Sequence, residues 1–243
     1  LKEQSGLNLS RLAFHLNANS SEARLQKFSL KMPGTELNLN DVTATYRMDN
    51  AKLMAGSLKF NGTTARSSVT LSDFAFILPT LRLFVDKWAV TVAFRGTDTD
   101  INIPRFGIIS RSGELSVDAS GQITHLNATP RWSVTVRDIS IAPGLSTRIG
   151  KSIKKDVAAV MPRLGHIRMN GKAGFDGHQT QGEINLSASE AGNVTADITM
   201  TPDKRFSGTV RTSGADIGQV VDNDKLGTIV ADIALDGRLP GNG

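Results

Sequence analysis

Residues 131–176 read RWSVTVRDISIAPGLSTRIGKSIKKDVAAVMPRLGHIRMNGKAGFD, and the order of elements in this stretch recurs along the chain. Apolar and polar residues alternate over Arg131–Ile141, which predicts a β-strand with one apolar face. After Pro143–Gly144, apolar residues recur at helical spacing, so we expect one amphipathic helix over about residues 145–161. Pro162 is expected to end this helix because proline has no amide hydrogen to donate. The alternation resumes at His166–Gly171, which predicts the next strand.

The frame of strand, break, short apolar segment, strand and glycine occurs in two further places. Residues 73–96 (DFAFILPTLRLFVDKWAVTVAFRG) precede the helix, and residues 216–237 (DIGQVVDNDKLGTIVADIALDG) follow it. The three frames end at Gly96, Gly171 and Gly237. Because recurring supersecondary units are typical of long β-rich arrays, we interpret residues 1–243 as a single β-rich segment of a larger repeat protein.

The alternation changes phase inside several of the expected strands. Apolar residues move from one parity to the other at positions 25/28, 39/42, 71/74 and 136/139. A slip of one residue would turn the following side chains to the opposite face, so we expect β-bulges at these places. Residues 69–77 are expected to form one such strand. Turn residues predict hairpins at Asn61–Gly62 and at Ser120–Gly121.

Together these patterns predict about fourteen to sixteen strands, as in all-β proteins. We expect a mostly β fold: a long, curved, twisted sheet of repeated antiparallel strands that forms a U-shaped groove. One amphipathic helix and one or two short helical segments, near residues 78–85 and 217–221, would accompany it. Only 39% of the residues are hydrophobic and 5% are aromatic. That composition is lean for a compact enzyme and ordinary for a sheet with one face in water.

Charge and residue types argue against several classes of partner. The net charge is +5, from 28 Lys and Arg against 23 Asp and Glu, and the basic residues are scattered. Nucleic-acid-binding proteins concentrate such residues on one face, so we expect no nucleic-acid partner. The absence of cysteine excludes disulfides and thiolate metal sites.

No residue pattern supports a metal site, a cofactor or catalysis. Asp222-Asn-Asp224 resembles the start of a calcium loop, with Gly227 at the +5 position, but Ile233 occupies the +11 position, where a bidentate glutamate is needed, so a turn is expected. Ser152 and Lys155 match a serine acyl-enzyme pattern whose other motifs are absent, so they are expected on a solvated helix face. We expect the protein not to be an enzyme. The four histidines lie far apart, without a second ligand at metal spacing: His15, His125, His166 and His178.

The alternation itself has two interpretations. In one, the apolar side chains form the closed core of a sandwich or barrel. In the other, they line an open groove that accepts acyl chains at about 0.8 kcal/mol per buried methylene. The candidate lining residues are Trp132, Val134, Val136, Ile184, Leu186, Val194, Ala196, Ile198, Met200, Ile229, Ala231 and Ile233.

Segments of the chain resemble a known family. The opening LKEQSGLNLSRLAFHLNANSSEARLQKFSLKMPGTELNLNDVTATY (residues 1–46) resembles part of the TamB proteins of Gram-negative bacteria, within the AsmA-like superfamily. It is most similar to the Bacteroides-type branch. IRMNGKAGFDG (167–177) and IALDGRLPG (233–241) are similar to the repeating β segments of that superfamily.

The resemblance implies a location and an activity. Such proteins are anchored in the inner membrane by an N-terminal helix and extend through the periplasm as a long U-shaped β structure with a hydrophobic inside. They are implicated in moving phospholipids toward the outer membrane. The TamB branch also acts in outer-membrane protein assembly with a barrel partner. The anchor and the partner-binding region would lie outside these residues, and the family has no catalytic residues to transfer.

Three functions therefore stay open at the level of the sequence. The first is an intermembrane lipid conduit whose partners are phospholipid acyl chains. The second is a scaffold for envelope protein assembly, whose exposed strand edges pair with client strands. The third is an adhesin or carbohydrate-binding domain, which would need aromatic platforms from the two Trp and one Tyr of the chain.

Overall fold

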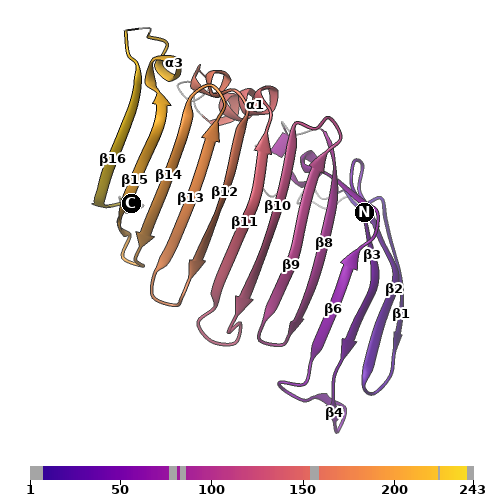
Figure 1. Cartoon of the computed structure of the whole chain (residues 1–243). Helices are drawn as coiled ribbons and strands as arrows, with labels where there is room; N and C mark the ends of the chain where they lie inside the picture. The colour runs from indigo at the N-terminus through magenta and orange to yellow at the C-terminus, as the bar shows by residue number, and fades with distance from the viewer. Residues whose placement is uncertain (1–7, 77–80, 83–85, 154–158, 224, 240–243) are drawn as a thin grey trace. The chain divides into compact units, whose positions relative to one another are not determined.

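The computed structural model describes residues 8–76, 81–82, 86–153, 159–223 and 225–239 (Figure 1). Strands account for 62% of the structure. Fourteen of them form one antiparallel sheet in the order β1-β2-β3-β6-β8-β9-β10-β11-β12-β13-β14-β15-β16, with β7 pairing β3 and β8. The prediction of a mostly β fold built on one large antiparallel sheet is confirmed.

The chain divides into two compact units. Unit 1 comprises Leu1–Gly113 and Ser120–Pro130, and unit 2 comprises Glu114–Ala119 and Arg131–Gly243. Strand β10 (Leu115–Thr124) therefore contributes its first half to unit 2 and its second half to unit 1. The frames predicted to end at Gly96, Gly171 and Gly237 do not coincide with this division, and the internal repeat stays a prediction.

Unit 1 contains a run of antiparallel strands and a short 3-10 helix. Its other elements are β1 (Arg11–Ala18), β2 (Glu22–Lys31), β3 (Glu36–Thr45), β4 (Met48–Asp49), β5 (Lys52–Leu53), β6 (Lys59–Thr64), β7 (Ser67–Thr70), η1 (Leu71–Phe74), β8 (Lys87–Thr97) and β9 (Ile101–Ser110). β6 and β7 both lie between β3 and β8 in the sheet, since each of them pairs with both of these strands. Asn38 bridges the interruption between them, since its backbone N donates to Ser67 Oγ at 2.9 Å and its Nδ2 donates to Arg66 O at 2.8 Å.

Unit 2 contains an antiparallel meander in which each strand pairs with the next along the chain. Helical segments follow β11 and β15. The elements are β11 (Arg131–Ile141), α1 (Pro143–Ile153), η3 (Met161–Leu164), β12 (Ile167–Phe175), β13 (Thr180–Ala188), β14 (Gly192–Met200), β15 (Arg205–Asp216), α3 (Ile217–Val221) and β16 (Thr228–Arg238). Figure 1 shows α1 and α3 at the same end of the unit 2 strands.

Bulges occur at three of the four predicted phase slips. In β2, Lys27 has a φ of 53° where the register with β1 shifts, and in β3, Asp41 has a φ of 42° where the register with β6 shifts. In β11, the register with β12 shifts between Val136 and Ile139. The extra residue keeps apolar side chains on one face although their spacing changes parity.

The fourth slip has another cause, and the expected strand over residues 69–77 is wrong. β7 ends at Thr70, and the 3-10 helix η1 begins at Leu71. The turn at Pro33–Gly34 imposes this change, because Gly34 N donates to the Asp73 carboxylate at 2.9 Å and Thr70 Oγ1 donates to Gly34 O at 3.0 Å. Residues 78–80 and 83–85 of the short helical segment expected at 78–85 lie outside the described residues.

Both predicted hairpin turns are also wrong, because Asn61–Gly62 lies inside β6 and Ser120–Gly121 lies inside β10. At Gly62 the reason is packing: a Cβ there would lie 2.6 Å from Phe94 Cζ on the neighbouring strand. The glycine therefore makes room for an aromatic ring and does not turn the chain. The tight turn of this region lies at Asn50–Ala51 between β4 and β5, where both residues have positive φ.

The helical predictions are confirmed where the structure describes the residues. α1 begins at Pro143, two residues before the expected start, which suits the preference of proline for the first helical turn. Residues 154–158 of the expected helix lie outside the described part. Pro162 belongs to the 3-10 helix η3 and so does not simply end a helix. α3 forms as expected, with the Asp216 carboxylate accepting from Gln219 N at its start.

Candidate apolar binding face

Strand register gathers the apolar side chains of unit 2 on one face of its sheet. Residues directly opposite on neighbouring strands point to the same face. The pairing connects one complete row from β11 to β16: Val136, Gly171, Ile184, Ala196, Val210 and Ile233. We call this surface, made of that row and the rows parallel to it, the apolar face.

All twelve lining residues predicted from the sequence lie on the apolar face. β11 contributes three of them, β13 two, β14 four and β16 three. The same pairings fix their places. One row of paired residues runs from Trp132 through Phe175 and Thr180 to Met200, and another runs from Leu186 through Val194 and Thr212 to Ala231. Sequence alternation therefore identified one continuous surface, because side chains in a strand alternate strictly between faces.

Further residues of this face belong to β12 and β15, which the sequence reasoning had not singled out. On these two strands every second residue lies on the apolar face. Glycine occupies one of these positions in each strand, Gly171 in β12 and Gly208 in β15. A Cβ at Gly208 would lie 2.0 Å from Asp197 O of the neighbouring strand, so this position accepts only glycine. The additional apolar side chains are Ile167, Met169, Ala173, Phe175, Phe206 and Val210.

The opposite face of the same strands is polar and carries cross-strand ion pairs. Lys172 Nζ lies 2.9 Å from Glu183 Oε2, and Arg211 Nε lies 3.1 Å from Asp232 Oδ2. The hydrogen bond from Lys172 to the Glu183 carboxylate raises the pKa of the lysine. Such exposed pairs contribute little stability. They do establish that this face is in water, so the sheet is amphipathic.

Buried residues of unit 2 lie at the end of the strands where the helical segments are found. At the end where Figure 1 shows α1 and α3, Leu145 of α1 is 2% exposed and Ile167 at the start of β12 is 4% exposed. Arg163 of η3 donates to the Asp222 carboxylate just after α3 at 2.6 Å, which ties the helical segments together. These contacts make a small buried core at this end of the strands.

The remaining rows of the apolar face are partly exposed. Ile184 is 45% exposed, Ile233 is 47% exposed and Val134 is 39% exposed, whereas Leu186, Val194 and Ile198 are half-buried. From the Trp132 row to the Ile139 row the strands extend about 20 Å, at roughly 3.4 Å per residue, and from β11 to β16 they extend about 24 Å, at roughly 4.8 Å per strand. The open surface is therefore about 500 Å² in projection, which is at the upper end of what monomeric proteins expose.

This face can bind apolar groups but cannot perform acid–base chemistry. At the paired positions of β11–β16, all of which the structure describes, its side chains are aliphatic, aromatic or threonine, and none is charged. Small residues alternate with larger ones along the row that contains Gly171, Ile184 and Ala196. This gives the surface a low relief along which an extended hydrocarbon chain can lie.

Two residues with candidate chemistry, His166 and Asp222, have structural roles. His166 Nε2 lies 2.8 Å from Ser140 Oγ, and Asp222 ends α3 with a φ of 62°. Asp224 and Lys155 are not among the described residues. In the part of the chain that is described, no three His, Asp or Glu side chains are grouped as metal ligands, and no helix has the length and apolar character needed to cross a membrane.

The sequence matches no family model, and it has no match among curated proteins or among solved structures.

Proposed function

We propose that this chain is a segment of an envelope protein that carries phospholipid between the inner and outer membranes. In this proposal the apolar face of unit 2 holds the acyl chains. The proposal rests on one observation: an uncharged surface that is partly exposed over most of its rows and is backed by an ion-paired face. The resemblance to TamB and AsmA-like proteins supplies the setting: a periplasmic protein anchored in the inner membrane through residues outside this segment.

The binding free energy expected on such a surface suits the transit of a lipid better than its storage. An acyl chain on an open face exposes one side to water. Binding therefore recovers about half of the transfer free energy of roughly 0.8 kcal/mol per methylene. A lipid leaving a bilayer therefore meets a partial substitute for the membrane interior on this face. Because no charged group on the face holds the chain in one position, the lipid can move from strand to strand.

Photocrosslinking in cells tests this proposal on the full chain. A benzophenone amino acid at Ile184 should form phospholipid adducts detectable by mass spectrometry after purification. The same amino acid at Glu183, the adjacent residue on the ion-paired face, is the matched control and should form none. Equal lipid adducts at both positions, or none at Ile184 in protein that also shows no lipid by native mass spectrometry, would refute the proposal.

A scaffold that pairs strand edges with client proteins is the alternative function. Val230 on β16 is 82% exposed. A benzophenone amino acid at Val230 separates the two functions, since a scaffold would form protein adducts there, with outer-membrane proteins among the clients.

A further inference from the structure

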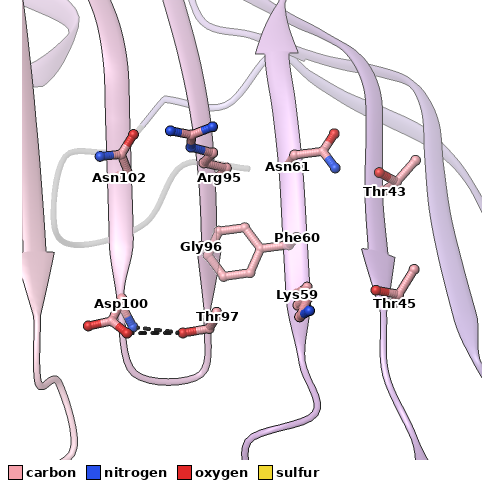
Figure 2. Close-up of a pocket in the computed structure, with 10 residues that line it drawn as sticks. All are labelled: Thr43, Thr45, Lys59, Phe60, Asn61, Arg95, Gly96, Thr97, Asp100 and Asn102. Atoms are coloured by element: carbon pink, nitrogen blue, oxygen red, sulfur yellow. Dashed lines mark hydrogen bonds between the residues drawn. The ribbon is translucent and has the colours of Figure 1, made fainter.

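A small hairpin projects from unit 1 where β3 is connected to β6. Its strands β4 and β5 pair with each other and with no other strand of the described residues. Figure 1 shows β4 beyond the ends of β3 and β6, and Figure 2 shows Thr45 and Lys59 side by side at those ends. Residues 47–56 are all exposed. The hairpin therefore lies outside the packed part of unit 1.

The hairpin is held at its base and at its tip. At the base, Arg47 N donates to Ser57 Oγ at 3.1 Å, and Gly56 N donates to the Asp98 carboxylate in the turn after β8. At the tip, both residues of the tight turn Asn50–Ala51 have positive φ, as in the type I′ turn that suits two-residue hairpins. These constraints present the side chains of the hairpin in a defined arrangement.

Apolar side chains occur on both faces of the hairpin. Met48 and Leu53 are directly opposite each other and share one face, and Met54 follows on the other face. The exposed fraction is 42% for Met48, 51% for Leu53 and 41% for Met54. A flat protein surface would cover only one face of the hairpin, whereas a fluid lipid interface can contact both.

Cations flank these apolar side chains. Arg47 and Lys52 each precede one of them directly, and Lys59 begins β6. None of the three belongs to an ion pair in the part of the chain that the structure describes. Asp49 is the single carboxylate of residues 47–54, against two cations. Lys and Arg can keep their charged ends at the level of lipid headgroups while their carbon stems contact apolar surface.

From these features we propose that the β4–β5 hairpin docks unit 1 on a membrane surface that contains anionic phospholipid. The three apolar side chains enter the boundary between headgroups and acyl chains, and Arg47 and Lys52 bind phosphate groups. The insertion is shallow, because backbone N–H and C=O groups at the edges of a two-stranded hairpin would have no partners in hydrocarbon. This docking is independent of the acyl-chain binding proposed for unit 2, since it uses other residues in another unit.

Flotation of the full chain with vesicles tests the docking. Vesicles of phosphatidylglycerol with phosphatidylcholine should bind at least about tenfold more of the chain than vesicles of phosphatidylcholine alone. The triple variant Met48→Ser, Leu53→Ser, Met54→Ser should lower the binding at least about tenfold. Leu53→Ser alone should also lower it. Its matched control is Ile109→Ser on β9, a side chain that is 60% exposed, which should bind like the unaltered chain.

Charge variants test the contribution of the cations. The double variant Arg47→Gln, Lys52→Gln should lose the preference for phosphatidylglycerol. Arg105→Gln removes an exposed charge from β9 and should leave the preference unchanged. Circular dichroism and thermal unfolding should be the same in every variant, because the replaced side chains are exposed.

A fluorescent label reports the contact without removing any of the apolar side chains. The chain has no cysteine, so Ala51→Cys at the tip can carry a single NBD group. Its emission should rise and shift to the blue when vesicles of phosphatidylglycerol with phosphatidylcholine are added. The same label at Ser112→Cys, in the exposed turn after β9 at the opposite end of the unit 1 strands, should not respond.

Three results would overturn the docking. They are equal losses of binding in Leu53→Ser and Ile109→Ser, equal binding to both kinds of vesicle, and a label at position 51 that does not respond. Protein adducts from a benzophenone amino acid at Leu53 in cells, without vesicle binding, would overturn it too and would identify a protein partner. The lipid adducts expected at Ile184 are a separate measurement, so failure of the docking leaves the proposal for unit 2 standing.

Discussion

Replacing Ile167 and Ile184 by alanine, one at a time, measures how much of the apolar face is covered in solution. Each change removes three carbon groups, worth about 2.4 kcal/mol of transfer free energy when fully buried. Ile167 is 4% exposed, so its loss also leaves a cavity and should cost about 3–4 kcal/mol. Ile184 is 45% exposed, so only about half of the transfer term applies, roughly 1.3 kcal/mol, without a cavity.

The comparison is well controlled because the two sites share their chemistry. Both isoleucines lie on the apolar face in adjacent strands, β12 and β13. The loss of intrinsic strand preference from Ile to Ala is therefore similar at both sites, and it cancels in the difference. The free energies of unfolding are read from urea denaturation by linear extrapolation. Circular dichroism and tryptophan fluorescence must give the same transition for the values to be used.

The expected difference between the variants is about 2 kcal/mol, with Ile167→Ala the less stable. Equal losses near 3 kcal/mol at both positions would refute the reasoning, because Ile184 would then be buried under a layer that closes the face. Such a result would also remove the physical basis for lipid binding there, whatever the family resemblance.

Two further predictions concern single side chains. Backbone N–H groups of Gln179 and His178 donate to Asp176 and lower its pKa, so its stabilising contribution is complete above the ordinary carboxyl pKa of about 4 and disappears as the pH falls through the lowered value. The loss of stability caused by Asp176→Ala should therefore be larger at neutral pH than near pH 2, and a loss independent of pH would contradict this. Asp216 accepts from Gln219 N at the start of α3, so Asp216→Ala should cost about 1 kcal/mol in thermal unfolding, with Asp216→Asn largely neutral. An unchanged melting temperature in the alanine variant would show that the cap is unimportant.

The composition of the candidate face could be predicted because strand geometry is local. Side chains alternate between faces whatever the rest of the chain does, so a run such as Arg131–Ile141 identifies its own apolar side. Bulges at Lys27 and Asp41 were predictable for the same reason, since a change of parity in the pattern has to be absorbed by an extra residue.

Turns were less predictable because glycine has more than one use. At Asn61–Gly62 the dipeptide is a typical hairpin signal, yet Gly62 lies in a strand because the ring of Phe94 occupies the space of its missing side chain. Phe94 is distant in sequence and becomes a neighbour only when β6 pairs with β8.

The sequence alone determines which side of each strand of unit 2 is apolar, because the alternation of side chains with a period of two is a property of the strand backbone. The exposure of that side depends on the tertiary structure. Ile167 and Ile184 are the same residue type on the same face, but one is buried and the other is nearly half exposed. Ile167 begins β12 at the end of the strands where the helical segments lie, whereas Ile184 lies in the middle of β13, and these surroundings are set by contacts between distant parts of the chain.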